Sequence, residues 1–202
     1  MSSVSNGEQP AVGLRERKKA KTKAAIRGHA MRLFQKQGYQ ATTVEQIAEA
    51  AEVSPSTFFR YFPTKEDVVL TDDYDPLILA AFRAQPAELS PVAALRAAMR
   101  AVFAGLTTEQ VELERERQAL ILSVPELRAA MLDGLRSTIQ LIAEAMAERV
   151  GRRPDEFAVR TFAGAVLGVV LASMFAAAEE PDADVFARVD DGLAQLEAGL
   201  PL

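Results

Sequence analysis

The chain has no cysteine and no tryptophan, and its 202 residues include one histidine. The absence of cysteine excludes disulfides, cysteine-ligated metal centres and thiol catalysis. The single histidine, His29, has no second histidine or cysteine with which to hold a metal ion, so we interpret it as a surface or partly buried side chain. The sequence also lacks a glycine-rich phosphate loop. We therefore predict no metal, no cofactor and no enzymatic activity.

Lysine is missing from the C-terminal two thirds of the chain, because all six lysines lie at or before Lys65. Residues 1–65 carry 11 Lys or Arg against 5 Asp or Glu, whereas residues 66–202 carry 12 against 23. The basic part can neutralise phosphates, and the acidic remainder is repelled by them. The N-terminal residues also lack the apolar region of a secretory signal, which favours the cytoplasm.

No β-strand alternation and no repeat is present, whereas apolar residues recur at spacings of three and four throughout. This pattern predicts an all-α protein of about nine helices: three short helices followed by a larger helical bundle. We expect a disordered basic arm over residues 1–20, a three-helix domain over 21–66 and a helical domain over 67–202. The first helix is expected from Thr22 to Gln37, and the polar stretch 71–76 is expected to kink or end the fourth.

The stretch from Thr42 to Lys65 predicts two short helices that meet at a tight turn. Thr43 and Gln46 have the spacing of a capping box, which starts a helix. Ser54 followed by Pro55 starts the next, with a hydroxyl cap and a proline at the first helical position. Because only two residues separate the expected helices, they must cross steeply, as in a helix-turn-helix.

The second of these helices is predicted to enter the major groove of DNA with its N-terminal turn. Phe58 and Phe62, four residues apart, are expected to face inward, while the neighbouring side chains face outward toward phosphates and base edges. Serine and threonine at the start of the helix offer little bidentate base pairing, which favours shape readout or contact with thymine methyls. The alternative is a packed helical corner without a DNA partner. The candidate DNA contacts are Thr43, Ser54, Ser56, Thr57, Phe59, Arg60, Tyr61 and Lys65.

Residues 23–69 resemble the DNA-binding domain of the TetR family of transcriptional regulators. The matching marks include Gly38-Tyr39, Thr42-Thr43-Val44, Ile47-Ala48, Val53-Ser54, Thr57 to Phe62 and Lys65-Glu66. Phe59 departs from the pattern, since the family more often has tyrosine there. The resemblance implies a homodimer on a palindromic operator of double-stranded DNA, usually acting as a repressor that a ligand releases.

A ligand pocket in a helical bundle lies between helices and is mostly apolar with a few polar anchors. The short segments Asp75-Pro76, Arg115-Glu116-Arg117 and Pro125 to Arg128 resemble the C-terminal domain of mycofactocin-system regulators, for which acyl-CoA thioesters are the implied effectors. We expect a small apolar or amphipathic effector, although each candidate could instead be ordinary core. The candidate pocket residues are Met99, Phe103, Glu114, Arg117, Leu120, Met131, Leu135, Met146 and Phe162.

The 18 residues from Thr161 to Ala178 carry no charge, which approaches the length of a membrane span. Ten of them are Ala, Gly, Ser or Thr, so we favour a soluble protein in which small residues let helices approach closely. The last two helices are predicted to form a four-helix dimer interface, although they could instead complete the core of one protomer. The candidate interface residues are Thr161, Ala165, Gly168, Ala172, Val185, Val189, Leu193 and Leu196.

The sequence leaves three functions open. A homodimeric repressor is favoured over a membrane-associated helical protein and over an enzyme with an appended helix-turn-helix. Within the first class, an activator or a regulator whose effector tightens DNA binding remains an alternative, because no residue decides the sign of the response. The identity of the effector and the operator sequence are likewise undetermined.

Overall fold

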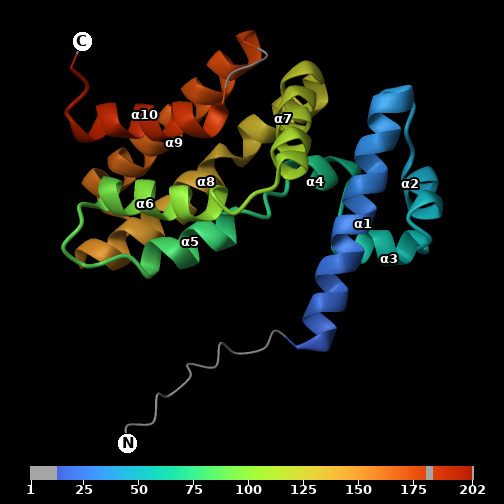
Figure 1. The fold of residues 1–202 in the computed structure, drawn as a ribbon, viewed down its shortest axis with the longest axis horizontal. Helices are drawn as coiled ribbons and strands as arrows, with labels where there is room; N and C mark the ends of the chain where they lie inside the picture. Colours follow the sequence, from blue (N-terminus) through green and yellow to red (C-terminus); the bar gives the residue numbers. More distant parts are fainter. Residues whose placement is uncertain (1–12, 181–183, 202) are drawn as a thin grey trace, which may run out of the picture. The chain divides into compact units, whose positions relative to one another are not determined.

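A computed structural model of the chain describes residues 13–180 and 184–201, and every regular element in these ranges is an α-helix. The chain divides into two compact units, one ending at Val69 and the other beginning at Leu70. The helices are α1 (Leu14–Gln37), α2 (Val44–Ala50), α3 (Pro55–Tyr61), α4 (Lys65–Leu70), α5 (Asp75–Arg83), α6 (Pro91–Phe103), α7 (Thr108–Ser123), α8 (Pro125–Val150), α9 (Phe157–Glu179) and α10 (Val185–Glu197) (Figure 1).

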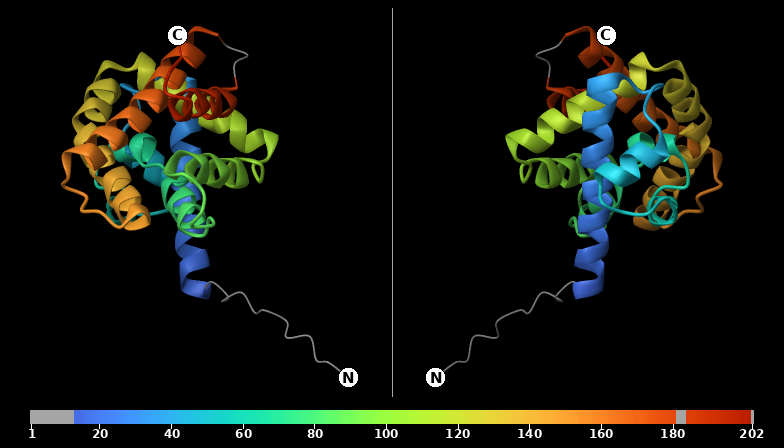
Figure 2. Two further views of the ribbon diagram at one scale, coloured as in Figure 1. Left: turned by 90° about the vertical axis from the view of Figure 1, so that its left-hand side faces the viewer. Right: turned by 90° about the vertical axis from the view of Figure 1, so that its right-hand side faces the viewer.

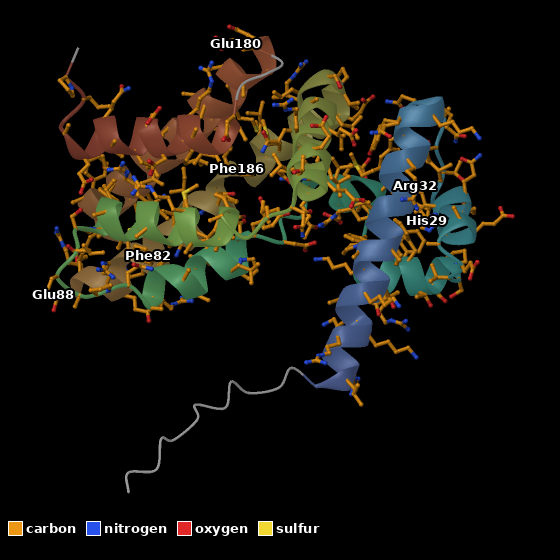
Figure 3. The ribbon with its side chains drawn as sticks, viewed as in Figure 1. His29, Arg32, Phe82, Glu88, Glu180 and Phe186 are labelled. Atoms are coloured by element: carbon orange, nitrogen blue, oxygen red, sulfur yellow. The ribbon has the colours of Figure 1, made fainter. Side chains whose placement is uncertain are left out.

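The first helix starts earlier than the sequence predicts. Residues 14–20, expected to belong to a disordered arm, form the first turns of α1. This expectation was wrong because the stretch consists of Leu, Arg, Glu, Lys and Ala, which are good helix formers, and contains no glycine or proline. The rest of the expected arm, residues 1–12, lies outside the described residues. His29 is half-buried on α1 (Figure 3).

In the first unit, α2 lies against α1, and α3 follows α2 across a tight turn (Figures 1 and 2). The turn requires a left-handed backbone at Glu52, where φ is 55°. Such a conformation costs a non-glycine residue about 1 kcal/mol. The turn is held by Val53, whose amide donates to the carbonyl of Ala48 at 2.9 Å. The core of this unit is filled by residues with no exposed surface, namely Ile26, Ile47, Phe58, Phe62, Val68 and Val69.

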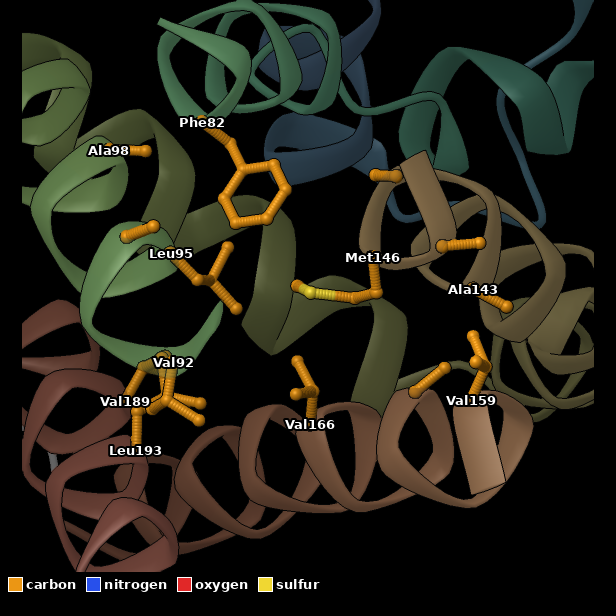
Figure 4. Close-up of a cluster of buried hydrophobic side chains, with 14 residues drawn as sticks. Phe82, Val92, Leu95, Ala98, Ala143, Met146, Val159, Val166, Val189 and Leu193 are labelled. Atoms are coloured by element: carbon orange, nitrogen blue, oxygen red, sulfur yellow. The ribbon is translucent and has the colours of Figure 1, made fainter. Parts of the chain in front are cut away.

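The second unit is a bundle in which α8 and α9 run side by side and α10 packs on both α9 and α6 (Figure 2). Close packing of α10 on α9 depends on Gly192, because a Cβ there would lie 2.7 Å from Cγ1 of Val169. The polar stretch 71–76 ends α4 rather than kinking it, which brings the described helices to ten. Figure 4 shows the apolar core of the bundle, which includes Phe82, Leu95, Met146, Val166 and Val189.

Candidate DNA-binding and effector sites

Both helices of the predicted helix-turn-helix are capped as their sequence indicates. The Thr43 hydroxyl accepts from the Gln46 amide at 3.3 Å, and the Gln46 side chain accepts from the Thr43 amide at 3.0 Å. The Ser54 hydroxyl accepts from the Thr57 amide at 3.1 Å and donates to the Thr57 hydroxyl at 3.0 Å. Thr43 and Ser54 therefore fix the helix starts, which limits the hydroxyl groups that remain for DNA.

The α3 helix divides into a buried side and an exposed side. Phe58 and Phe62 have no exposed surface, whereas Phe59 is 49% exposed. Ser56 and Arg60 are also exposed, and the Arg60 guanidinium lies 5.5 Å from the ring centroid of Tyr61. Thr57 and Tyr61 are partly exposed. Six of the eight predicted contacts thus fall within or just before α3, and none of the six is buried in the core. They are Ser54, Ser56, Thr57, Phe59, Arg60 and Tyr61.

Lys65 has a structural task that the sequence did not reveal. Its ammonium donates to the carbonyls of Tyr39 and Thr42 at 3.0 and 3.1 Å and lies 4.1 Å from the centroid of the Tyr39 ring. The Tyr39 hydroxyl in turn donates to Glu66 at 3.0 Å. Burial alone would raise the pKa of Glu66, but hydrogen bonds from its own amide and from Tyr39 outweigh burial and lower it. Lys65 thus ties the start of α4 to the turn that precedes α2.

The second unit encloses a cavity of about 230 Å³ between α5, α6, α7, α8, α9 and α10. Five of the predicted pocket residues line it, namely Met99, Phe103, Glu114, Arg117 and Met146. The other four do not. On α7, the lining positions are spaced by three and four residues, which turns Leu120 to another face. On α8, the lining begins at Thr138, later than Met131 and Leu135. Phe162 packs against the core cluster instead.

Sequence reasoning missed the polar wall of this cavity. Asp72, Tyr74 and Asp75 line it, although they looked like residues of a connecting segment. The only sequence signal was the run of aspartates at positions 72, 73 and 75, which leads into α5, whose second residue is Pro76. Burial raises the pKa of Tyr74, and the nearby charge of Glu114 raises it further.

A buried ion pair anchors the polar wall. The Glu114 carboxylate accepts from Nε and Nη2 of Arg117 at 2.8 and 2.6 Å, and both residues are under 10% exposed. Asp72 accepts from the same Nη2 at 3.4 Å. Burial opposes the charge on Arg117, but the hydrogen bonds and charge of Glu114 outweigh burial and raise the pKa of Arg117. The guanidinium is therefore permanently charged and firmly held.

The predicted dimer residues separate into two groups. On α9, Thr161, Gly168 and Ala172 are exposed and Ala165 is half-buried. On α10, Val189 and Leu193 are buried in the core of the protomer, and Leu196 packs against that core. Val185 lines the cavity. Val189 and Leu193 thus pack within the protomer, where α10 lies against α6 and α9, so the predicted contact of these two residues with a partner is not favoured.

Two family models together match most of the chain. Residues 26–71 match the bacterial regulatory proteins of the tetR family, and residues 89–201 match the C-terminal domain of MftR. The second match alone spans more than half of the sequence. The chain belongs to the TetR family of transcriptional regulators, with an MftR-type C-terminal domain, and its relatives are regulators of transcription rather than enzymes.

Two curated relatives bear this out. The chain is 38% identical over 151 residues to the HTH-type transcriptional regulator TcmR of Streptomyces glaucescens, a match that covers 71% of this chain and 67% of TcmR. It is 29% identical over 160 residues to the putative mycofactocin biosynthesis transcriptional regulator MftR of Mycobacterium tuberculosis, covering 78% of this chain and 80% of MftR.

Two solved structures share the fold. Thermus thermophilus FadR, a TetR-family repressor in complex with lauroyl-CoA, matches with 28% identity and a TM-score of 0.53, covering 89% of this chain and 95% of FadR. SmeT, the repressor of the SmeDEF multidrug efflux pump of Stenotrophomonas maltophilia, matches with 21% identity and a TM-score of 0.58, covering 88% and 89%. At that identity, the likeness to SmeT concerns the fold alone.

Proposed function

We propose that the protein is a homodimeric repressor that binds a palindromic operator and is released by a small apolar or amphipathic effector. The observation that carries this proposal is the division of α3 into buried Phe58 and Phe62 on one side and exposed Ser56, Phe59 and Arg60 on the other. A short helix anchored in this way can present its outer side to a groove without losing its core. The exposed basic turns at the start of α1 add phosphate contacts.

A second copy of the chain is the partner that α9 requires. This is the one described helix long and apolar enough to cross a membrane, and only 22% of its most apolar stretch is buried. Cβ atoms added at Gly164 and Gly168 would meet nothing within 4 Å, and Phe157 and Phe175 are 86% and 44% exposed. Within a TetR-family regulator, a symmetry-related α9 covers such a face better than lipid does, since the small residues permit close helix approach. We infer a cytoplasmic dimer.

The connection between α4 and α5 carries the effector signal in this proposal. α4 ends at Leu70, and Asp72 already lines the cavity. An effector that reorganises the polar wall therefore acts within two residues of α4. A displaced α4 changes the spacing of the two α3 helices from the one helical turn of DNA, about 34 Å, that adjacent half-sites require.

Operator selection from random duplex DNA, combined with the mass of the protein in solution, tests the proposal. A palindromic consensus bound by a dimer, or by two dimers, is the expected outcome. Transcription from a promoter that carries this site then separates repression from activation, and separates release by the effector from tightening. Absence of any enriched sequence at low salt would contradict the proposal.

Variants of α3 and of Lys65, at the start of α4, test how α3 docks on DNA. Tyr61→Ala is expected to weaken binding to all sequences alike, because a phosphate contact carries no sequence information, whereas Ser56→Ala or Thr57→Ala should change the preferred sequence. Lys65→Ala should weaken binding to all sequences and also destabilise the first unit, because its ammonium holds two carbonyls. Unchanged affinity in all four variants would exclude this docking.

A further inference from the structure

The cavity of the second unit is apolar over most of its wall and charged at one end. Its apolar wall includes Ile78, Leu95, Met99 and Met146. At the other end, three carboxyl groups, those of Asp72, Asp75 and Glu114, face one guanidinium, that of Arg117. The charged end therefore has an excess of negative charge when all of these groups are ionised.

Among the described residues that line the cavity, Arg117 is the one cation, and it is already bonded to other residues of the protein. Arg117 directs Nε and Nη2 to Glu114, and Nη2 also reaches Asp72. Gln118 donates a further hydrogen bond to Glu114 at 2.9 Å, and the Tyr74 amide donates to Asp72 at 2.7 Å. Two of the three carboxylates thus have donors of their own. An anionic headgroup would have to displace Glu114 from Arg117 and leave a carboxylate buried without its partner.

Asp75 is the third carboxylate, and its side chain accepts no hydrogen bond from the described residues, 13–180 and 184–201. It is the first residue of α5, and it is an exposed residue that lines the cavity. Burial raises the pKa of Asp75 to about 6, and repulsion from Asp72 contributes to the rise. The charge of Arg117 opposes this rise in the pKa of Asp75 without cancelling it. At neutral pH the Asp75 carboxylate is therefore ionised and can accept a hydrogen bond from a donor in the cavity.

We propose that the effector is a cationic amphiphile, whose apolar body occupies the cavity and whose protonated amine donates hydrogen bonds to Asp75. This inference deepens the proposed function, on which it rests, by naming the charge of the effector. An ammonium supplies several N–H donors and offsets the excess of negative charge, whereas a carboxylate or a phosphate adds to it. The protein thereby differs from FadR, which was solved with an acyl-CoA thioester.

Three probes with one alkyl chain separate charge from hydrophobicity: octylamine, octanoate and octan-1-ol. Isothermal titration of the full-length protein at pH 7.5 measures the affinity of each, and lauroyl-CoA is measured alongside. We expect octylamine to bind about tenfold more tightly than octan-1-ol, in line with one charge-assisted hydrogen bond in a partly desolvated site. We expect octanoate and lauroyl-CoA to bind more weakly than octan-1-ol.

Asp75→Asn keeps the shape of the side chain and removes its charge. This variant should reduce the preference for octylamine about fivefold to tenfold and leave the affinity of octan-1-ol within twofold. Asp133→Asn is the matched control, because Asp133 is an exposed carboxylate of α8 that does not line the cavity. It should change neither affinity.

The outcomes separate this inference from the proposed function. Equal binding of octylamine and octan-1-ol, tighter binding of octanoate or lauroyl-CoA, or an unchanged preference in Asp75→Asn would each overturn the cationic effector while operator binding persists. Failure of every probe to bind would overturn it as well. Failure of operator selection would instead overturn the regulator itself, and octylamine binding would then still report on the cavity.

Discussion

The two units of the chain differ in how completely their interiors are filled and in how their cationic side chains are paired. In the first unit the largest side chains fill the interior, and the Lys65 ammonium is satisfied by backbone carbonyls and an aromatic ring. In the second unit the bundle retains a cavity of about 230 Å³ and buries Arg117 among carboxylates that outnumber it. A filled interior holds one conformation, whereas an incompletely filled one with unbalanced charge responds to what enters it. The first arrangement suits a rigid reader of DNA, and the second suits a sensor.

The largest expected contrast comes from truncating one apolar side chain in each unit. Phe58→Ala should destabilise the first unit by about 3–5 kcal/mol, because Phe58 is fully buried and a cavity replaces its ring. Met99→Ala should cost only about 1 kcal/mol, because Met99 is partly buried and already borders empty space. Urea unfolding followed by circular dichroism measures both, with DNA binding as a second readout that only Phe58→Ala should abolish. Equal losses would show that the cavity wall is as tightly packed as the core of the first unit.

Breaking the ion pair of the second unit should have the next largest effect. Glu114→Gln leaves the Arg117 guanidinium buried with weaker partners, and we expect a loss of about 2–3 kcal/mol in thermal unfolding. Glu112→Gln is the control, since Glu112 is exposed and its nitrogen–oxygen distance to Arg115 is 4.0 Å. Surface pairs of this kind contribute about 0–1 kcal/mol. A Glu114 variant as stable as its control would mean that Asp72 and Asp75 can replace the lost carboxylate.

The two units also differ in how far the sequence predicts them. Local sequence patterns predict the first unit well. The structure confirms the cap at Thr43, the helix start at Ser54-Pro55, and the burial of Phe58 and Phe62 that their four-residue spacing indicates. These patterns miss the left-handed turn at Glu52, which the tight crossing imposes on a residue without the freedom of glycine.

In the second unit the sequence predicts helices but not their partners. The stripe of α10 has the periodicity expected of any buried face, and nothing in it distinguishes a protomer core from a dimer interface. The polar wall of the cavity was missed for a similar reason. Asp72 and Asp75 lie close together in the sequence, but Glu114 and Arg117 of α7 line the same cavity only through the fold, in which Arg117 reaches Asp72. Such a cluster depends on tertiary packing, which no local pattern reports.

Two matched helix caps offer a finer comparison. Thr43 and Thr107 each form a capping box with a glutamine three residues later. Both are exposed, so Thr43→Ala and Thr107→Ala should each destabilise their own unit by about 1 kcal/mol. Thermal unfolding measures that cost. Only Thr43→Ala should weaken DNA binding beyond what the stability loss explains, because only Thr43 lies at the start of the helix-turn-helix. A similar loss of binding in Thr107→Ala would contradict a separate role for Thr43.

The smallest expected effect concerns two acidic side chains whose pKa values shift in opposite directions. The pKa of Asp75 rises from an ordinary 3.8 to about 6, so between these pH values the folded state binds more protons than the unfolded state and stability falls as pH rises. Asp75→Asn should therefore stabilise the protein at pH 7, by about 0.5–1 kcal/mol once the exposure of the residue is allowed for. The gain should vanish near pH 4.

Glu66 supplies the opposite case in the first unit. Its pKa is lowered, so its contribution to stability is present above the unfolded value of 4.5 and is lost as pH falls through the folded one. Glu66→Gln should then destabilise the protein at pH 7, whereas Asp75→Asn stabilises it. Chemical unfolding of both variants at pH 4, 5.5 and 7 measures the two trends. If Asp75→Asn lowered the free energy of unfolding at pH 7, a protein group would already stabilise the Asp75 carboxylate. The charged end of the cavity would then not favour a cationic ligand.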